Sequence, residues 1–553
     1  MSVEKLIVDH METWTSALQT RSTAGRGSSG KIDLYGIKKL RELILELAVR
    51  GKLVPQDPND EPASDLLKRI AAEKAELVKQ GKIKKQKPLP EISEEEKPFE
   101  LPEGWEWVHL PDIYCSISES SRKIKSSEIL PEGKYPVIEQ SQEFISGYCN
   151  NECLLIKLNN PVIVFGDHTR NIKFIDFDFV VGADGVKILS PILICERFFF
   201  WQLRSFKLDV RGYARHFKVL NSCLFALPPI AEQERIVEKV SSLMSLCDQL
   251  EQQSLTSLDA HQQLVETLLG TLTDSQNTAE LAENWARISE HFDTLFTTEA
   301  SVDALKQTIL QLAVMGKLVP QGPNDEPASE LLKRIAQEKA QLVKEGKIKK
   351  QKPLPPISDE EKPFELPEGW EWCRIGNIVN IKSELVSPKD YLNLYQVAPD
   401  IIEKGTGRVI SKRTVKESGV KGPNSRFYKG QIVYSKIRPS LSKVFLAEYN
   451  GLCSADMYPL DCYINPNYLL KYILSIPFLM QVKKAENRIK MPKLNSDSFY
   501  NIIVAIPPYN EQQAIFDKIN SIEAVCNGLI SYIGIYHKTQ LHLADALTDA
   551  AIN

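Results

Sequence analysis

The chain carries one long sequence twice. Residues 51–107 recur at 316–372 with 50 of 57 positions identical and a constant spacing of 265 residues. The segments that follow the two copies, 108–226 and 373–506, share no comparable identity. A repeat of this length encodes the same supersecondary unit twice. The sequence therefore predicts one scaffold that holds two different inserts.

A second, shorter repeat closes each insert. LPPIAEQERIVEKV at 227–240 is echoed by IPPYNEQQAIFDKI at 506–519, now at a spacing of 279 residues. If the end of the chain packs beside its beginning, the two ends rebuild a second copy of the central scaffold, and a pseudo-twofold, cyclic arrangement results. Five regions are predicted: a conserved helical region at 1–107, insert one at 108–226, a central conserved region at 227–372, insert two at 373–506 and a conserved helix at 507–553.

Helical patterns precede and fill the 57-residue repeats. Within the two copies, helices are expected to follow the cap residues Ser64 and Ser329 and to end at Gly81 and Gly346. The GKIKKQKPLP segment that follows is expected to be an extended linker, and its lysines are interpreted as a solvated tether in preference to a DNA contact. An apolar stripe at helical spacing precedes the first copy, at Leu40, Leu43, Ile44, Leu47 and Ala48.

Long helices are expected after each insert. The paired prolines end a strand and begin a helix, and Glu232 and Glu511 fall in the first turn, where a carboxylate complements the helix dipole. From Pro229 the helix is expected to extend to about Gly270, with apolar residues spaced as in a coiled coil. Its counterpart at the C-terminus is expected to be shorter.

Both inserts have the patterns of β-rich domains. Short apolar or alternating runs such as PVIVFG and GQIVYSKI are separated by Gly, Asn and Asp. Each insert then has an aromatic-rich helical stretch, ERFFFWQLRS or NYLLKYILSI, and a basic final segment that ends in Leu-Asn-Ser. We therefore expect one fold with diverged surfaces, and an α+β protein in which two β-rich domains are joined by antiparallel long helices.

Composition restricts the class of protein. The hydrophobic fraction of 43% and the charged fraction of 25% are ordinary for a soluble domain. The N-terminus lacks the apolar core of a signal peptide, and Glu196 and Arg197 interrupt the most apolar run. Ten scattered cysteines are expected to be isolated buried thiols, because Cys149 and Cys153 have no second pair at zinc-finger spacing. These features indicate a cytoplasmic protein.

The chain lacks the motifs of several enzyme classes. A DNA adenine methyltransferase needs Asn or Asp before Pro-Pro-aromatic, but Ile506 stands there. No glycine-rich cofactor fingerprint, GxxxxGKS/T loop or HExxH motif occurs. Asp167 and His168 are interpreted as a polar loop contact in preference to a hydrolytic site, since no nucleophile is specified. We therefore predict no catalytic, cofactor-binding or metal-binding residue.

The charge of the chain is unevenly distributed. The net charge is −4 overall, but insert two has 20 basic and 10 acidic residues, whereas insert one has 14 and 13. From Lys404 to Lys443, eleven basic residues accompany one acid, Glu417. Such a stretch favours contact with DNA phosphates, and Arg, Gln and Asn can also read guanine and adenine. The candidate DNA-binding residues are Gln140, Gln142, His168, Arg170, Asn171, Lys173, Arg211, Arg215, Lys218, Arg408, Lys412, Arg413, Arg426, Lys436, Arg438, Arg488, Lys490 and Lys493.

LPEGWEW before each insert, PPxxEQ after it and the cyclic repeat together resemble the specificity subunits of Type I restriction-modification systems. The long GKLVPQDPNDEPAS…LPEGWEW element is similar to the Type IB branch. The resemblance implies that each insert is a target recognition domain for one half of a split, asymmetric DNA site. It also implies docking to two modification subunits, which use S-adenosylmethionine for N6-adenine methylation, and to two restriction subunits, which use ATP and Mg for cleavage.

Two alternatives stay open at this point. The chain could be a self-sufficient DNA methyltransferase or nuclease with diverged motifs, although no cofactor loop supports this. It could also be a coiled-coil scaffold without a DNA function, which the excess positive charge of insert two disfavours.

Overall fold

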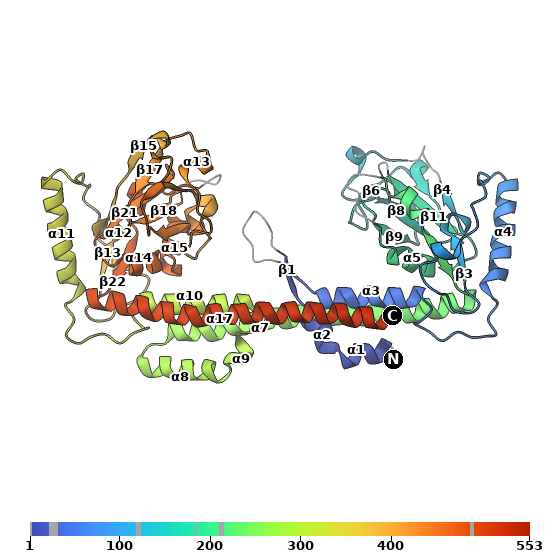
Figure 1. Cartoon of the computed structure of the whole chain (residues 1–553), viewed down its shortest axis with the longest axis horizontal. Coiled ribbons are helices and arrows are strands. Elements are labelled where there is room, and N and C mark those ends of the chain that lie inside the picture. The colour runs from blue at the N-terminus through green and yellow to red at the C-terminus, as the bar shows by residue number, and fades with distance from the viewer. Residues whose placement is uncertain are drawn as a thin grey trace. The chain divides into compact units, whose positions relative to one another are not determined.

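The computed structural model describes residues 3–21, 31–117, 123–182, 185–208, 215–486 and 492–552. The chain forms two compact units, one of residues 1–257 with 535–553 and the other of residues 258–534. Each unit contains one β-rich insert and a set of helices (Figure 1). The predicted α+β class is therefore confirmed. None of the helices in the described ranges has the length and apolar character that crossing a membrane requires.

Two long helices each contribute to both units. The helix α7 (Ile230–Asp274) begins in the first unit and ends in the second, whereas α17 (Tyr509–Ile552) begins in the second and ends in the first. They contain 45 and 44 residues. The C-terminal helix is shorter, as expected, but only by one residue.

The first unit joins the two ends of the chain. It contains α1 (Val3–Asp9), α2 (Met11–Ser16), the hairpin of β1 (Gln19–Arg21) and β2 (Lys31–Asp33), and α3 (Tyr35–Val49). The Tyr35 hydroxyl on α3 donates to Asp545 on α17 at 2.7 Å. The last region of the chain therefore packs with the first, as the cyclic repeat predicts.

The second unit has a helical core of its own. Val265, Leu269 and Leu272 of α7 are buried in one apolar cluster with Cys526 and Ile533 of α17. Three further helices complete this part: α8 (Thr278–Glu290), α9 (Phe292–Leu295) and α10 (Glu299–Val314). The two long helices thus pack together through apolar side chains, as their spacing predicts.

The repeated segments form the same helix in both units, α4 (Ala63–Lys79) and α11 (Ala328–Lys344). Gly81 and Gly346 follow these helices with φ of 70° and 71°, the left-handed backbone that glycine favours, as predicted. The predicted serine caps are wrong, because each helix begins one residue before its serine. The Ala63 amide donates to the Gly104 carbonyl oxygen at 2.8 Å, and the same bond recurs in the second copy. This tertiary contact fixes the helix start.

Insert one contains three sheets. A ribbon of β3 (Glu106–His109) and β12 (Leu224–Leu227) joins its two ends. An antiparallel sheet has the order β4-β11-β8-β9, and another has the order β6-β5-β10-β7, in which β5 and β10 are parallel. The strands are β4 (Tyr114–Ile117), β5 (Tyr135–Ile138), β6 (Gly147–Cys149), β7 (Leu155–Ile156), β8 (Val162–Gly166), β9 (Ile172–Ile175), β10 (Phe179–Val181) and β11 (Val186–Pro191), followed by α5 (Glu196–Ser205) and α6 (Phe217–Leu220).

Insert two repeats the ribbon and the first sheet, and its second sheet differs in having one edge strand on the opposite side. Its ribbon pairs β13 (Glu371–Arg374) with β22 (Ile503–Ile506), and its sheets have the orders β14-β21-β18-β19 and β15-β17-β20-β16, the latter with β16 and β20 parallel. The expectation of one fold in both inserts is confirmed. The remaining elements are α12 (Ile375–Ile378), β14 (Val379–Ile381), β15 (Glu384–Val386), β16 (Tyr395–Val397), α13 (Val415–Ser418), β17 (Asn424–Phe427), β18 (Ile432–Ser435), β19 (Val444–Leu446), β20 (Gly451–Ser454), β21 (Met457–Cys462), α14 (Pro466–Ile473), α15 (Ile476–Ala485) and α16 (Ser496–Tyr500).

The Leu-Asn-Ser sequence shared by the two inserts is not structurally equivalent. Asn221 follows the last residue of α6, whereas Asn495 precedes α16 and caps it through a side-chain bond to the Ser498 amide. The tripeptide therefore ends a helix in one insert and begins one in the other.

The cysteines are all unpaired. Five of them are buried and Cys153 is exposed, so the expectation of isolated thiols is confirmed, whereas burial holds for only half of them. Among the described residues, no cluster of three or more His, Cys, Asp or Glu side chains could hold a metal ion.

Candidate DNA interface

A tryptophan and a glutamate fasten each insert to the scaffold. In the first unit, the Trp105 indole, next to the ribbon, donates to the buried Glu232 carboxylate at the start of α7 at 2.8 Å. Trp370 donates to Glu511 at 2.9 Å in the second. Burial raises the pKa of both carboxyl groups, and the indole bond opposes that shift. The repeated GWEW and Glu-Gln motifs therefore form the joint between scaffold and insert.

The glutamine of each Glu-Gln pair holds the helix that follows the insert's sheets. Gln233 accepts from the Cys195 amide at 3.0 Å, and Gln512 accepts from the Asn465 amide at 2.9 Å. Cys195 and Asn465 are the residues immediately before α5 and α14. Both glutamines are fully buried. The sequence motif gave no indication of this second contact.

Lysines of the repeated helices also reach the inserts. On α11, Lys339 donates to the Gly376 and Val379 carbonyl oxygens at 2.6 and 3.0 Å. On α4, Lys74 donates to the Pro111 carbonyl oxygen at 2.5 Å. Burial lowers the pKa of Lys339 to about 8 and also lowers that of Lys74.

The Lys339 contact is expected to make stability depend on pH. Its pKa is about 8 in the folded chain, below the ordinary 10.5, so the unfolded chain binds the proton more tightly between these values. The contribution of Lys339 to the free energy of unfolding should therefore rise with pH across that window. Denaturant unfolding of wild type and Lys339→Met at about pH 7.5 and about pH 9.5 measures it. A difference between the two proteins that fails to grow with pH would contradict the assignment.

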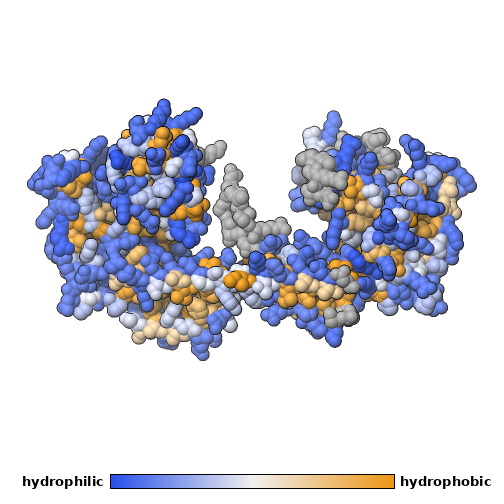
Figure 2. Space-filling view, viewed as in Figure 1, coloured by the Kyte–Doolittle hydropathy of each residue, from blue (hydrophilic) through white to orange (hydrophobic). Residues whose placement is uncertain are grey.

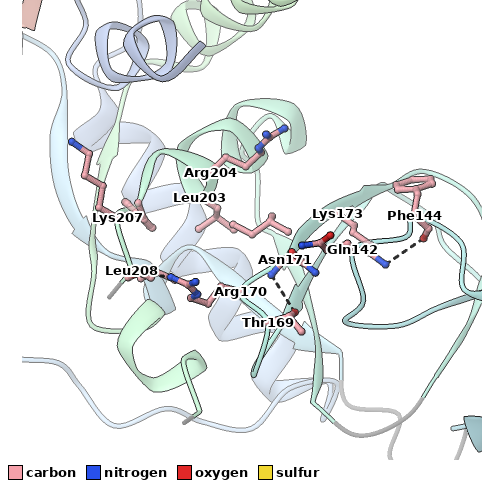
Figure 3. A pocket seen from close by; sticks show the side chains of 12 residues that line it. Gln142, Phe144, Thr169, Arg170, Asn171, Lys173, Leu203, Arg204, Lys207 and Leu208 are labelled. Atoms are coloured by element: carbon pink, nitrogen blue, oxygen red, sulfur yellow. Dashed lines mark hydrogen bonds between the residues drawn. The ribbon is translucent and has the colours of Figure 1, made fainter. Parts of the chain in front are cut away.

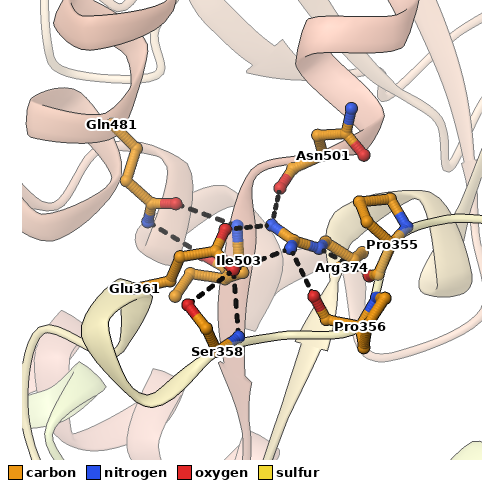
Figure 4. Close-up of polar contacts among 8 residues, drawn as sticks. All are labelled: Pro355, Pro356, Ser358, Glu361, Arg374, Gln481, Asn501 and Ile503. Carbon is orange, nitrogen blue, oxygen red and sulfur yellow. Dashed lines mark hydrogen bonds and ion pairs between the residues drawn. The ribbon is translucent and has the colours of Figure 1, made fainter.

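In the second unit, the Arg374 side chain adds a network of hydrogen bonds (Figure 4). Its guanidinium forms two bonds with Glu361 at 2.7 and 2.9 Å and donates to the carbonyl oxygens of Pro355, Pro356 and Asn501. Arg374 is 6% exposed. At the equivalent position of the first unit, the His109 ring has one hydrogen bond within the described residues, with the Pro90 carbonyl oxygen at 2.8 Å.

Several candidates of insert one come together on one loop. The Gln140 carbonyl oxygen accepts from the Thr169 hydroxyl and from the Asn171 amide at 2.9 Å, and the Gln140 side chain accepts from the His168 backbone amide at 3.2 Å. The loop between β8 and β9 therefore lies against the end of β5. Gln140, His168 and Asn171 therefore form one polar cluster.

A groove of about 630 Å³ lies beside this cluster. Figure 3 shows Gln142 and Arg170 among its lining residues, together with Arg204 and Lys207 from the end of α5 and the segment after it. Arg170 donates to the Leu208 carbonyl oxygen at 2.7 Å and keeps further N–H groups. The groove is thus polar and basic.

Lys173 has a supporting position. It is 6% exposed, and its ammonium donates to the carbonyl oxygens of Glu139, Glu143 and Phe144. In Figure 3 its amine points toward Phe144. Because these bonds occupy its three donors, support of the 139–144 segment fits this placement better than a phosphate contact.

Asp167 is also structural. It is buried, and its carboxylate accepts from the Phe217 amide at 2.8 Å while its carbonyl oxygen accepts from His216. Asp167 therefore holds the start of α6, in line with the interpretation as a loop contact. The candidates Arg215 and Lys218 beside α6 are exposed. Arg211 lies outside the described residues.

Acidic residues from outside the basic stretch of insert two pair with its arginines. Arg413 forms two bonds with Asp400 at 2.9 and 3.0 Å and a third with the buried Gln396. Arg408 pairs with Glu403 at 2.8 Å. These acids lie just before Lys404, so a count from 404 to 443 omits them.

Two further acids act in the same way. Arg426 lies 3.7 Å from Glu384, and Lys436 and Lys493 lie 3.9 and 3.3 Å from Asp456. The local positive charge is therefore smaller than the composition suggests, and these five pairs include most of the basic contacts predicted for insert two. Exposed ion pairs of this kind contribute little to stability and can exchange for other partners.

Several cations of insert two are exposed without an ion pair in the described part of the chain. Lys412 lies over the Tyr395 and Tyr449 rings, 5.9 and 5.4 Å from their centroids. The face of insert two seen in Figure 2 is mainly hydrophilic. Arg488 and Lys490 lie outside the described residues. Within residues 404–443 these exposed cations are Lys404, Lys412, Lys416, Lys421, Lys429 and Arg438.

The sequence profile of the Type I restriction modification DNA specificity domain matches residues 102–260 and 367–533. The two matches begin at equivalent prolines of the repeat and together cover more than half of the chain. The chain belongs to the Type I restriction-modification specificity subunits. The family resemblance carried by LPEGWEW and PPxxEQ is confirmed. As a specificity subunit, the chain is itself non-catalytic, and the inserts carry its two recognition domains.

Relatives of this specificity subunit extend over its whole length. It is 51% identical to the EcoAI specificity subunit and 48% identical to the EcoEI specificity subunit, both from Escherichia coli, over 100% of each chain. These similarities agree with the Type IB resemblance. The crystal structure of the HsdS subunit from Thermoanaerobacter tengcongensis is 16% identical, with a TM-score of 0.37, and the alignment covers 83% of this chain and 98% of that one.

Proposed function

We propose that each insert of this specificity subunit reads one half of an asymmetric, bipartite DNA site. The observation that supports this most directly is the pair of equivalent joints, Trp105–Glu232 and Trp370–Glu511, which hold domains that share the ribbon and the strand order of one four-stranded sheet but differ in sequence. Two domains that are attached in the same way but have different surfaces would recognise two different DNA sequences. Exposed cations of insert two would meet phosphates, which position a protein on DNA, while polar loops would meet base edges.

The proposal extends to the partners. The scaffold would dock two modification subunits for N6-adenine methylation with S-adenosylmethionine, and two restriction subunits would supply ATP- and Mg-dependent cleavage. The complex would act on DNA in the cytoplasm. The modification subunits would each flip an adenine out of its half-site, because a base inside the duplex is beyond the reach of the methyl donor.

Exchange of insert two tests the modular assignment. Residues 373–506 are replaced with the corresponding segment of a family member of different specificity, and Trp370 and Glu511 are retained. In the complex with modification subunits, sequencing of methylated adenines should show one changed half-site and one unchanged half-site. A change in both half-sites, or in neither, would refute the proposal.

A further inference from the structure

Two arginines occupy left-handed backbone at equivalent places in the two inserts. Arg170 has φ of 63° in the loop from β8 to β9, and Arg438 has φ of 45° in the loop from β18 to β19. These hairpins hold the same position in the strand order of their sheets. In the described part of the chain, only Leu193 and Ser442 share this backbone region among non-glycine residues. A long side chain there is strained, and such strain is frequent where a side chain must be aimed.

Matching main-chain bonds hold the residue after the strand in both loops. The Asp167 amide donates to Gly185 at 2.7 Å, and the Lys436 amide donates to Asp456 at 3.0 Å. Gly185 and Asp456 stand directly before the equivalent strands β11 and β21.

The arginines themselves are also held by their backbone. The Arg170 amide donates to the Gly166 carbonyl oxygen and the Arg438 amide to the Pro492 carbonyl oxygen, each at 2.8 Å. Leu494 closes the second loop with a bond to the Lys436 carbonyl oxygen at 2.9 Å. The backbone at each arginine is therefore fixed, and with it the direction in which the side chain begins.

The two guanidinium groups remain available. Arg438 is exposed, and within the described ranges its side chain has no ion pair or hydrogen bond. This distinguishes it from Arg408 and Arg413, which are neutralised by acids. Arg170 is half-exposed, donates through one nitrogen and lines the basic groove of insert one.

Resting on the proposed function, we propose that Arg170 and Arg438 are specificity-determining residues that each read a guanine in their own half-site. A guanidinium donates two parallel bonds to guanine O6 and N7, and this pairing requires a fixed approach. Phosphates make no such demand, and exposed lysines such as Lys416 and Lys421 can meet them. The strained loops supply the fixed approach.

Arg438→Gly tests the inference without disturbing the loop. Glycine adopts positive φ without strain, so the thermal midpoint of the complex should stay the same or rise. Methylation of a DNA library with a randomised insert-two half-site should lose about 10- to 100-fold of its preference at one G·C pair. The insert-one half-site should be unchanged. Arg170→Gly should give the reciprocal result.

Ser442→Gly is the matched control. Ser442 lies in the same loop with φ of 47°, and its buried hydroxyl has no hydrogen-bond partner. This substitution should leave all base preferences intact. A uniform loss of binding in Arg438→Gly, with a salt slope smaller by about 1, would assign a phosphate contact and overturn the inference. Unchanged preference would also overturn it. If insert exchange still transfers a half-site, the proposed function stands in either case.

Discussion

Trp370→Ala is expected to lower the free energy of unfolding of the second unit by about 3–5 kcal/mol. The substitution removes a large buried side chain and leaves the buried Glu511 carboxylate without its indole donor. A buried acceptor that loses its partner adds a further cost of desolvation. Hydrogen exchange resolves the effect by segment: amides of β22 and the start of α17 should lose protection.

Trp105→Ala is the matched control for this prediction. The same bond, at the same position of the repeat, lies in the first unit. Protection should therefore be lost in β12 and the start of α7, while β22 stays protected. Equal loss in both units from either variant would show that the joints do not act locally.

Arg374→Ala is expected to lower the unfolding free energy by about 2–4 kcal/mol, because removing one partner of a buried ion pair leaves polar groups unsatisfied. Three backbone carbonyl oxygens and Glu361 lose their donor together. Glu361 is partly exposed and can bind water in place of Arg374, which limits the loss. Denaturant unfolding monitored in the second unit measures the loss.

His109→Ala provides the comparison at the equivalent position. His109 makes one contact with a backbone carbonyl oxygen and is not fully buried, so its loss should cost less than about 1 kcal/mol. An equal loss of unfolding free energy in both variants would show that the five-bond network of Arg374 stabilises the fold no more than the single bond of His109.

The repeats made the scaffold predictable from sequence, since identical segments in one chain must fold alike. They predicted the equivalent helices α4 and α11, the glycine helix ends and the packing of the chain end with its beginning. The helix starts were missed because the bond from Ala63 to Gly104 is tertiary and has no local sequence signal.

The candidate DNA interface was less predictable, because pairing across a fold is invisible in a linear count. Glu417 is the single acid within the basic stretch, but this count omits acids that pair with basic residues of insert two in the fold. Asp400, Glu403 and Asp456 come from neighbouring loops. Lys173 has the sequence context of a contact residue, yet three carbonyl oxygens surround its amine. The left-handed arginines are a property of backbone angles, which arginine itself does not signal.

The joints have a consequence for how such a protein changes its target over evolution. Gln233 and Gln512 bind backbone amides of the inserts, and Lys339 and Lys74 bind backbone carbonyl oxygens. Since every residue offers a backbone carbonyl oxygen and every residue except proline a backbone amide, these attachments tolerate almost any insert sequence. Arg374, Lys471 and Asn465 are exceptions, because these side chains belong to the insert and bond to scaffold residues. Mutations can therefore change the recognition surfaces of the inserts while the contacts between insert and scaffold are kept.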